Sequence, residues 1–304
     1  MILIAARLPH NANLTLQRRA GTCPSPWRVC SAVDVMLTDS ARAPMASLAT
    51  QKSPLGDHSY VLSQDVVHVW RIPVAASAAQ LSEFSYLLSE TERQRASRFV
   101  QEADRARFQL GRAATRALLS RYLARPAAAI GLVADAHGKL RMQTAPAADQ
   151  PLIHFNLSHS GDWVVLAFSR TCALGIDVEA IAERAVSTDL IAYVMSEHEQ
   201  QGLQSLPAQR QRAAFFKCWT SKEAFIKGCG IGLRAALKQI EVCVDPQQPA
   251  RLIGAPAVLR PDEWSLHTLA IPQGYAATLA VAAARVQIID IAIDSWRDIA
   301  PVVR

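Results

Sequence analysis

A helix that carries two charges on an apolar face constrains this chain of 304 residues more than any other feature. Pro207 is expected to begin this helix, and Gly228 is expected to end it in a glycine-rich exit. At 3.6 residues per turn, Glu223 and Lys227 lie on one face together with aromatic side chains. An exposed i,i+4 ion pair, worth about 0.2–0.5 kcal/mol, is one interpretation. Because the neighbouring side chains are aromatic, we favour a buried pair with further partners.

A second stretch, residues 173–179, supplies two more carboxylates. Its alternation of apolar and polar residues predicts a strand, which follows another strand at 163–168 across a short turn. Asp177 and Glu179 then point to the same side of the sheet, where they repel each other unless a cation or a proton lies between them. Together with Glu223 they offer oxygen ligands to a hard cation. Mg2+ suits such a set, because it prefers octahedral oxygen ligands and completes its shell with substrate phosphates.

Composition narrows the class of protein. Half of the residues are apolar and 19% are charged, which is typical of a globular protein with one or two domains. No apolar run approaches the roughly 20 residues that cross a bilayer, and no secretory pattern opens the chain, so we expect a soluble cytoplasmic protein without membrane contact. The six cysteines show no Cys-x-x-Cys spacing, which argues against zinc sites and disulfides. A net charge of +6 favours acidic partners such as phosphorylated cofactors, acidic proteins or nucleic acid.

The beginning of the chain differs from the rest. Residues 1–58 contain scattered arginine, proline and serine without a sustained helix or strand period, so we expect an N-terminal extension of poor order. A start of translation at Met36 or Met45 is an equally good interpretation. The folded part is expected to open with a strand at 66–72.

An arginine-rich segment follows this strand. Ser89 is expected to begin a helix, because a glutamate three residues later completes a capping box. Between Glu90 and Arg125, nine arginines stand against four acids. Helical spacing turns the apolar side chains inward and most arginines outward, and Pro126 ends the run. The arginines form either a solvated basic face or a surface for phosphate or an acidic helix, with Arg95 as the preferred candidate.

Polar residues gather just before the strand at 163–168. Ser158 to Asp162 are expected to form a turn that enters this strand. His159 and the serines on either side of it either hydrogen-bond the local backbone or contact a bound phosphate. A Ser-His hydrolase is a rival interpretation, but no Gly-x-Ser-x-Gly elbow accompanies these residues.

An internal similarity indicates two related halves. Residues 161–167 and 274–280 both run from a glycine through an aromatic residue into an apolar strand that ends in Leu-Ala. We therefore expect an α+β protein made of a pseudo-twofold pair of similar halves, with a cleft at their interface. The expected boundaries are 59–172 for the N-terminal half, 173–285 for the C-terminal half and 286–304 for a tail to which we assign no chemistry.

Three ordered motifs resemble the Sfp-type 4'-phosphopantetheinyl transferases. They are Phe155 to Gly161, Gly175 to Glu179, and Trp219 to Gly228 with the glycines that follow, and their order and spacing fit the family. The resemblance implies the α+β fold of that family, which binds coenzyme A and Mg2+, or Mn2+ in its place, between the two halves. It also implies that a monomeric enzyme transfers the 4'-phosphopantetheine arm to a serine of an apo acyl, peptidyl or aryl carrier protein and releases 3',5'-ADP.

The resemblance also implies roles for individual residues. Three carboxylates would hold the metal, namely Asp177, Glu179 and Glu223. Glu223 would also accept the proton of the carrier serine, directly or through water, and Lys227 would stabilise the pyrophosphate and the departing 3',5'-ADP. Four residues would line the site for adenine and its 3'-phosphate, namely Arg95, Lys139, Ser158 and His159.

The chain departs from the family pattern at three positions, and two alternative functions stay open. The chain carries Glu92, Phe108 and Leu140 where family members often have other residue types. One alternative is a basic module that binds phosphate groups or nucleic acid through its arginines without catalysis. It leaves the three carboxylates and the nearby lysine without a role, and the basic stretch lacks interleaved aromatic residues, so we expect no nucleic-acid partner. The other alternative is a member of the family that has lost catalysis and only docks carrier proteins.

Overall fold

The computed structural model describes residues 61–75, 80–143, 152–182, 186–232 and 237–301. The expected N-terminal extension at 1–58 lies outside the described residues. None of the helices in these described ranges is long and apolar enough to cross a membrane.

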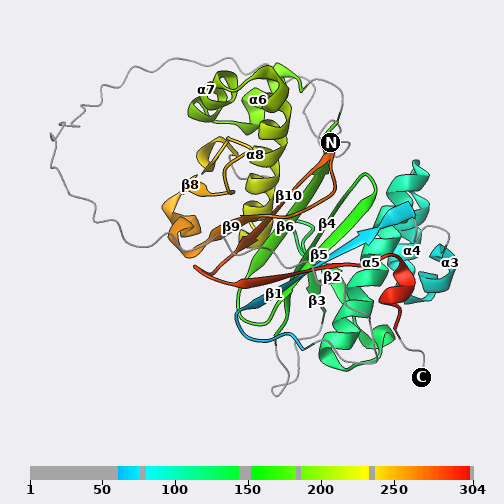
Figure 1. Ribbon diagram of the computed structural model, residues 1–304. Helices are drawn as coiled ribbons and strands as arrows, with labels where there is room; N and C mark the ends of the chain where they lie inside the picture. The colour runs from blue at the N-terminus through cyan, green and yellow to red at the C-terminus, as the bar shows by residue number, and fades with distance from the viewer. Residues whose placement is uncertain (1–60, 76–79, 144–151, 183–185, 233–236, 302–304) are drawn as a thin grey trace, which may run out of the picture. The chain divides into compact units, whose positions relative to one another are not determined.

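Helices and strands come in groups along the described chain: one strand, three α-helices, five strands, three α-helices and five strands. Figure 1 shows how they are arranged. The α-helices are α3 (Leu81–Phe84), α4 (Glu90–Ser97), α5 (Glu102–Leu123), α6 (Thr188–Val194), α7 (Glu197–Ser205) and α8 (Ala208–Cys229). The strands are β1 (Val66–Pro73), β2 (Leu132–Ala134), β3 (Leu140–Met142), β4 (His154–Ser160), β5 (Trp163–Ser169), β6 (Leu174–Ala180), β7 (Glu241–Val242), β8 (Leu252–Gly254), β9 (Ser265–Thr268), β10 (Tyr275–Val281) and β11 (Gln287–Ala292).

Two sheets with the same internal order form the centre of the described chain. One has the order β11-β1-β5-β4 and the other has the order β6-β10-β9. In the first sheet, β1 and β4 both pair antiparallel with β5. In the second sheet, β6 and β9 both pair antiparallel with β10 in the same way. The long helix α5 follows β1 and contacts β4 and β5, whereas α8 follows β6 and contacts β6 and β10. The predicted α+β fold with two similar halves is therefore confirmed, and the two similar sequence stretches form the central strands β5 and β10.

The core explains why β5 is apolar along its whole length. Val164, Leu166 and Phe168 belong to the hydrophobic cluster that includes the inner face of α5. Val165 and Ala167 point the other way, into a second cluster that β5 shares with apolar residues of β6 and β10. A strand that is buried on both faces has no polar face, so its residues form a continuous apolar run.

The arginine-rich segment forms two helices rather than one. The predicted capping box at the start of α4 is confirmed, because the Ser89 hydroxyl accepts from the Glu92 N–H at 3.3 Å and the Glu92 carboxylate accepts from the Ser89 N–H at 2.9 Å. The chain then becomes extended at Gln101 before α5 begins. Arg116 is an exception to the expected outward arginines, since it is buried and donates to Glu92 at 2.7 Å.

The end of the chain contradicts the expectation of a tail. Residues of β11 pair in parallel with β1, from Gln287 opposite Val66 to Ala292 opposite Arg71. Trp296 follows this strand and is only 1% exposed within the cluster under α5. The apolar residues after position 286 are a strand and a core anchor, so the prediction of a terminal extension was wrong for the described part of 286–304.

Candidate active site

An unusually close crossing of α8 over β6 brings the predicted site residues together. Gly175 lies under the last turns of α8, where an added Cβ would come within 2.1 Å of the Ala224 carbonyl oxygen and 2.3 Å of the Gly228 nitrogen. Gly228 in turn lies against Trp264, 2.5 Å from the position of an added Cβ. The helix begins after Pro207 as predicted and ends one residue beyond the predicted Gly228. This glycine is needed for close packing inside the helix, and α8 ends at Cys229, where Gly230 adopts a left-handed φ of 73°.

The face of β6 that is turned toward α8 carries the acidic residues. Its apolar residues point into the core between the two sheets, so the alternation of the strand directs Asp177 and Glu179 to the opposite face. Asp177 and Glu223 are 2% and 7% exposed, which makes them buried carboxylates. The Lys227 ammonium donates to Oδ1 of Asp177 at 2.5 Å. The β6 and α8 side chains of this region thus include an ion pair between buried Asp177 and half-buried Lys227.

Side chains of β4 connect its edge to the edge of β6. The Ser158 hydroxyl donates to Oδ1 of Asp177 at 2.8 Å, and the Ser160 hydroxyl donates to Oε2 of Glu179 at 2.8 Å. The backbone N–H groups of β6 also bond to β4 side chains, with the Asn156 carbonyl oxygen accepting from residue 176 at 2.9 Å and Ser160 Oγ accepting from residue 180 at 3.0 Å. We call this row of contacts from Asn156, Ser158 and Ser160 the β4–β6 seam. It holds both β6 carboxylates in fixed orientations.

Burial and mutual repulsion shift the protonation of the site. Burial first, and the charge of Asp177 second, raise the pKa of Glu223 to about 7. The same two causes raise the pKa of Glu179. Burial opposes the charged form of Lys227, but the charges of Asp177 and Glu223 outweigh it and raise the pKa of the ammonium. The site therefore places a carboxyl group that titrates near neutral pH beside a cation that stays protonated.

The carboxylates fit a divalent cation in charge and in ligand type. Across the described ranges, no three histidine, cysteine, aspartate or glutamate side chains already stand in a metal-binding arrangement. Among the described side chains, however, Oδ2 of Asp177 and Oε1 of Glu223 are buried without a hydrogen-bond partner. Such oxygens are costly unless an ion, a water molecule or a proton satisfies them. Lys227 balances one negative charge of the group, and a divalent cation would balance the others.

The predicted ligands of the nucleotide come from three parts of the fold, namely β4, the turn before β3 and α4. Ser158 belongs to the carboxylate site, where it also accepts from the Lys227 ammonium at 3.1 Å. His159 is the next residue on β4, where burial first, and then the charges of Lys227 and Arg107, lower the pKa of its imidazole to about 4. Its imidazole is therefore neutral at pH 7.

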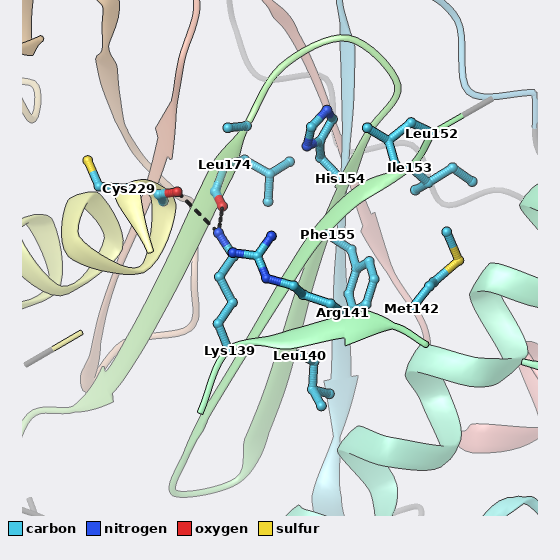
Figure 2. A pocket seen from close by; sticks show the side chains of 12 residues that line it. Lys139, Leu140, Arg141, Met142, Leu152, Ile153, His154, Phe155, Leu174 and Cys229 are labelled. Carbon is cyan, nitrogen blue, oxygen red and sulfur yellow. Dashed lines mark hydrogen bonds between the residues drawn. The ribbon is translucent and has the colours of Figure 1, made fainter. Parts of the chain in front are cut away.

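The other two predicted nucleotide ligands come from separate places. Lys139 lines a pocket of about 440 Å³ at the end of α8, and its ammonium donates to the backbone carbonyls of Leu174 and Gly228 there (Figure 2). Arg95 lies on the last turn of α4, with its guanidinium 5.2 Å from the centre of the Phe108 ring. The Arg112 guanidinium lies 5.1 Å from the centre of the same ring, so two guanidinium groups pack against Phe108.

The sequence reasoning missed residues whose contacts cross between the halves. Residues 154–160 are a strand rather than the start of a turn, and the turn is formed by Gly161 and Asp162. The Asp162 N–H donates to the Tyr275 hydroxyl at 2.9 Å, so the two similar glycine turns touch each other. Strand alternation from Phe155 onward could have identified Asn156 and Ser160, because it places them on the same side as Ser158.

Comparisons with known proteins agree with this two-half fold and acidic site. The description "4'-phosphopantetheinyl transferase, N-terminal" matches residues 74–171, and "4'-phosphopantetheinyl transferase superfamily" matches residues 173–280. The chain belongs to the 4'-phosphopantetheinyl transferase superfamily.

Three relatives illustrate the extent of the similarity. The 4'-phosphopantetheinyl transferase HetI of Nostoc sp. is 35% identical over 221 residues, which cover 73% of this chain and 90% of the relative. The 4'-phosphopantetheinyl transferase psf-1 of Bacillus pumilus is 38% identical over 165 residues, covering 52% of this chain and 64% of the relative. The 4'-phosphopantetheinyl transferase Sfp of Bacillus subtilis is 30% identical over 166 residues, covering 55% of this chain and 70% of the relative.

Proposed function

We propose that this protein transfers the 4'-phosphopantetheine group of coenzyme A to a serine of an apo-carrier protein and releases 3',5'-ADP. The observation that carries the proposal is the convergence of Asp177 and Glu179 from β6 with Glu223 and Lys227 from α8, in a chain that belongs to this superfamily. In the reaction the serine oxygen forms a bond to the phosphorus that carries pantetheine. The phosphoanhydride bond breaks, and the serine proton passes to a base.

Glu223 is the proposed base. In the metal-free site, burial raises the pKa of Glu223 to about 7, so its carboxylate is a stronger base than that of an ordinary glutamate. Oε1 of Glu223 has no hydrogen-bond partner among the described residues, and we assign the serine proton to this oxygen, directly or through one water molecule. A serine hydroxyl is a poor nucleophile at this pH without such help.

Asp177, Glu179 and Glu223 are the proposed ligands of Mg2+, or of Mn2+ in its place. When bound, the ion would neutralise the pyrophosphate oxygens of coenzyme A. Hard cations of this kind prefer carboxylate and phosphate oxygens. The β4–β6 seam supports this role, because Ser158 and Ser160 each hold one of the β6 carboxylates in place.

Lys227 and the arginines supply positive charge for the nucleotide part. The Lys227 side chain is 29% exposed, and we assign its ammonium to a bound pyrophosphate and to the departing 3',5'-ADP. His159 and Arg95 are the proposed contacts of adenine and its 3'-phosphate, with neutral His159 acting through hydrogen bonds. A monomeric state, a cytoplasmic location and the absence of nucleic-acid binding remain predictions.

Intact mass spectrometry of the carrier tests the transfer directly. The protein is incubated with coenzyme A, Mg2+ and a panel of apo acyl, peptidyl and aryl carrier proteins. We expect a carrier to gain the mass of phosphopantetheine as 3',5'-ADP appears, and a Ser→Ala carrier to gain none. Failure to modify any carrier of the panel would contradict the proposed function.

Replacing the proposed base tests the mechanism. Glu223→Gln removes the proton acceptor but preserves size, so turnover should fall about 10²–10⁴-fold while the protein stays folded. Glu197→Gln on exposed α7 is the matched control and should keep full turnover. Full activity of Glu223→Gln would show that another group accepts the serine proton.

A further inference from the structure

The turn between β2 and β3 directs Lys139 toward the C-terminal half. Gly138 adopts a left-handed φ of 85° in this turn. The Asp135 carboxylate accepts hydrogen bonds from the backbone N–H groups of His137 and Lys139, both at 3.0 Å, and from the side chain of Arg141 at 3.1 Å. The two backbone contacts at Oδ1 of Asp135 fix the point from which the Lys139 side chain leaves the backbone.

The Lys139 ammonium makes three hydrogen bonds, all to backbone carbonyl oxygens of the C-terminal half. Figure 2 draws the bonds to the carbonyls of Leu174 and Gly228. The acceptors are the carbonyls of Lys227 at 2.6 Å, Gly228 at 3.1 Å and Leu174 at 3.2 Å. An ammonium has three donors and no acceptor, so these contacts use its full capacity. A phosphate could bind this ammonium only if it displaced at least one of the carbonyls.

Two of these carbonyls, those of Lys227 and Gly228, are ones that a helix end leaves unpaired. The last four carbonyls of an α-helix have no partner within the helix. In α8 the Ile226 carbonyl accepts from the Gly230 N–H at 2.9 Å, and Lys139 supplies donors to the next two carbonyls. The ammonium also lies at the negative end of the helix dipole, which favours a cation there. Lys139 therefore completes the end of α8 from outside the helix.

We propose that Lys139 is a positioning residue that clamps the last turn of α8 to the start of β6 and so holds Lys227 opposite Asp177. The clamp joins the halves, because Lys139 belongs to the β2–β3 hairpin whereas α8 and β6 belong to the C-terminal half. It replaces the role of a nucleotide ligand that family resemblance implies for Lys139. What Lys227 does once it is held there rests on the proposed function.

Kinetics with two co-substrates separate the clamp from a ligand role. Lys139→Met removes the donors but retains a long side chain, and misplacement of Lys227 should lower kcat about 10- to 100-fold. The loss should be equal with coenzyme A and with 3'-dephospho-coenzyme A, and KM for either should change less than about twofold. A phosphate ligand gives a different pattern, in which KM rises for coenzyme A and not for the 3'-dephospho form. That pattern would overturn the clamp.

Arg141→Met is the matched control for charge. Arg141 lines the same pocket, so its replacement removes the same positive charge but leaves the carbonyls of α8 paired with Lys139. This control should keep kcat within about twofold of the wild type, since Arg141 is 59% exposed and pairs with Oδ2 of Asp135, whereas the two backbone N–H groups of the turn bond to Oδ1. If Arg141→Met lowered kcat as much as Lys139→Met does, the positive charge of the pocket rather than the clamp would explain the loss of kcat, and the clamp would be overturned.

Hydrogen–deuterium exchange tests the clamp without using activity. Peptides that cover the last turn of α8 should exchange faster in Lys139→Met than in the wild type or Arg141→Met, because the helix end opens more often. Unchanged exchange would overturn the clamp whatever the kinetics are. If the wild type modifies no carrier, the proposed function fails, and exchange alone still decides the clamp. Lys139→Gln, which keeps two N–H donors, provides the same measurements if the methionine variant does not fold.

Discussion

At the scale of single residues, the hydroxyl of Ser160 connects the two halves at the acidic site. It donates to the Glu179 carboxylate and accepts from the backbone of β6, so it fixes both the side chain and the strand that carries it. Glu179 is also a proposed ligand of the divalent ion. Groups that orient metal ligands influence metal affinity even though they do not touch the metal.

Ser160→Ala should therefore weaken metal binding about 10- to 100-fold. The expected result is a higher Mg2+ requirement for transfer and a lower affinity for Mn2+, which electron paramagnetic resonance measures without coenzyme A or carrier. Ser205→Ala on the exposed end of α7 is the control. Unchanged Mn2+ affinity in Ser160→Ala would contradict the positioning role of this hydroxyl.

At the scale of elements, the crossing of α8 and β6 decides where the site residues lie. Gly175 has no room for a side chain, because the atoms nearest to an added Cβ are backbone atoms of α8 that cannot turn aside. A larger residue must push the helix away from the strand. The carboxylates of β6 would then lose their alignment with Glu223 and Lys227.

Gly175→Ala should lower the free energy of unfolding by about 1–3 kcal/mol, as overpacking of a core does, and should also lower turnover. Urea denaturation measures the first effect, and the carrier mass assay measures the second. Gly254→Ala in β8 is a matched control, because an added Cβ there has no atom within 4 Å. Equal stability of both variants would show that α8 can adjust its position at little cost.

Local patterns predicted the elements of the site but not all of their contacts. The helix with Glu223 and the strand with Asp177 follow from periodicity, which depends only on neighbouring residues in the chain. The β4–β6 seam could not be predicted in this way, because it joins the edges of two sheets through side chains. Gly228 was assigned to the helix end because a glycine there usually stops a helix, whereas tertiary packing against Trp264 requires it inside.

At the scale of the whole described chain, its last strand closes the sheet of the N-terminal half. Strand β11 pairs with β1, which lies more than 200 positions earlier, so short-range sequence patterns carry no signal for this pairing. Trp296 follows it and packs against Phe84, with 4.6 Å between the ring centres. The C-terminal residues thus contribute to the core of the other half.

Trp296→Ala should lower the free energy of unfolding by about 3–5 kcal/mol, because it empties a buried aromatic site. Chemical denaturation followed by circular dichroism measures the change. Tyr86→Ala is the control, since this side chain is 54% exposed. A loss below about 1 kcal/mol for Trp296→Ala would mean that the segment after β11 is dispensable for stability.

The β4–β6 seam also governs how this enzyme tolerates genetic change. Each of the two sheets keeps its own complete backbone ladder, and the described links between their facing edges are side-chain contacts of Asn156, Ser158 and Ser160. A single amino-acid substitution can remove such a side-chain hydrogen bond. The backbone hydrogen bonds within each sheet survive almost any substitution, because every residue type except proline can make them. Substitutions at these three positions of β4 should therefore change the orientation of the β6 carboxylates and leave the two sheets intact.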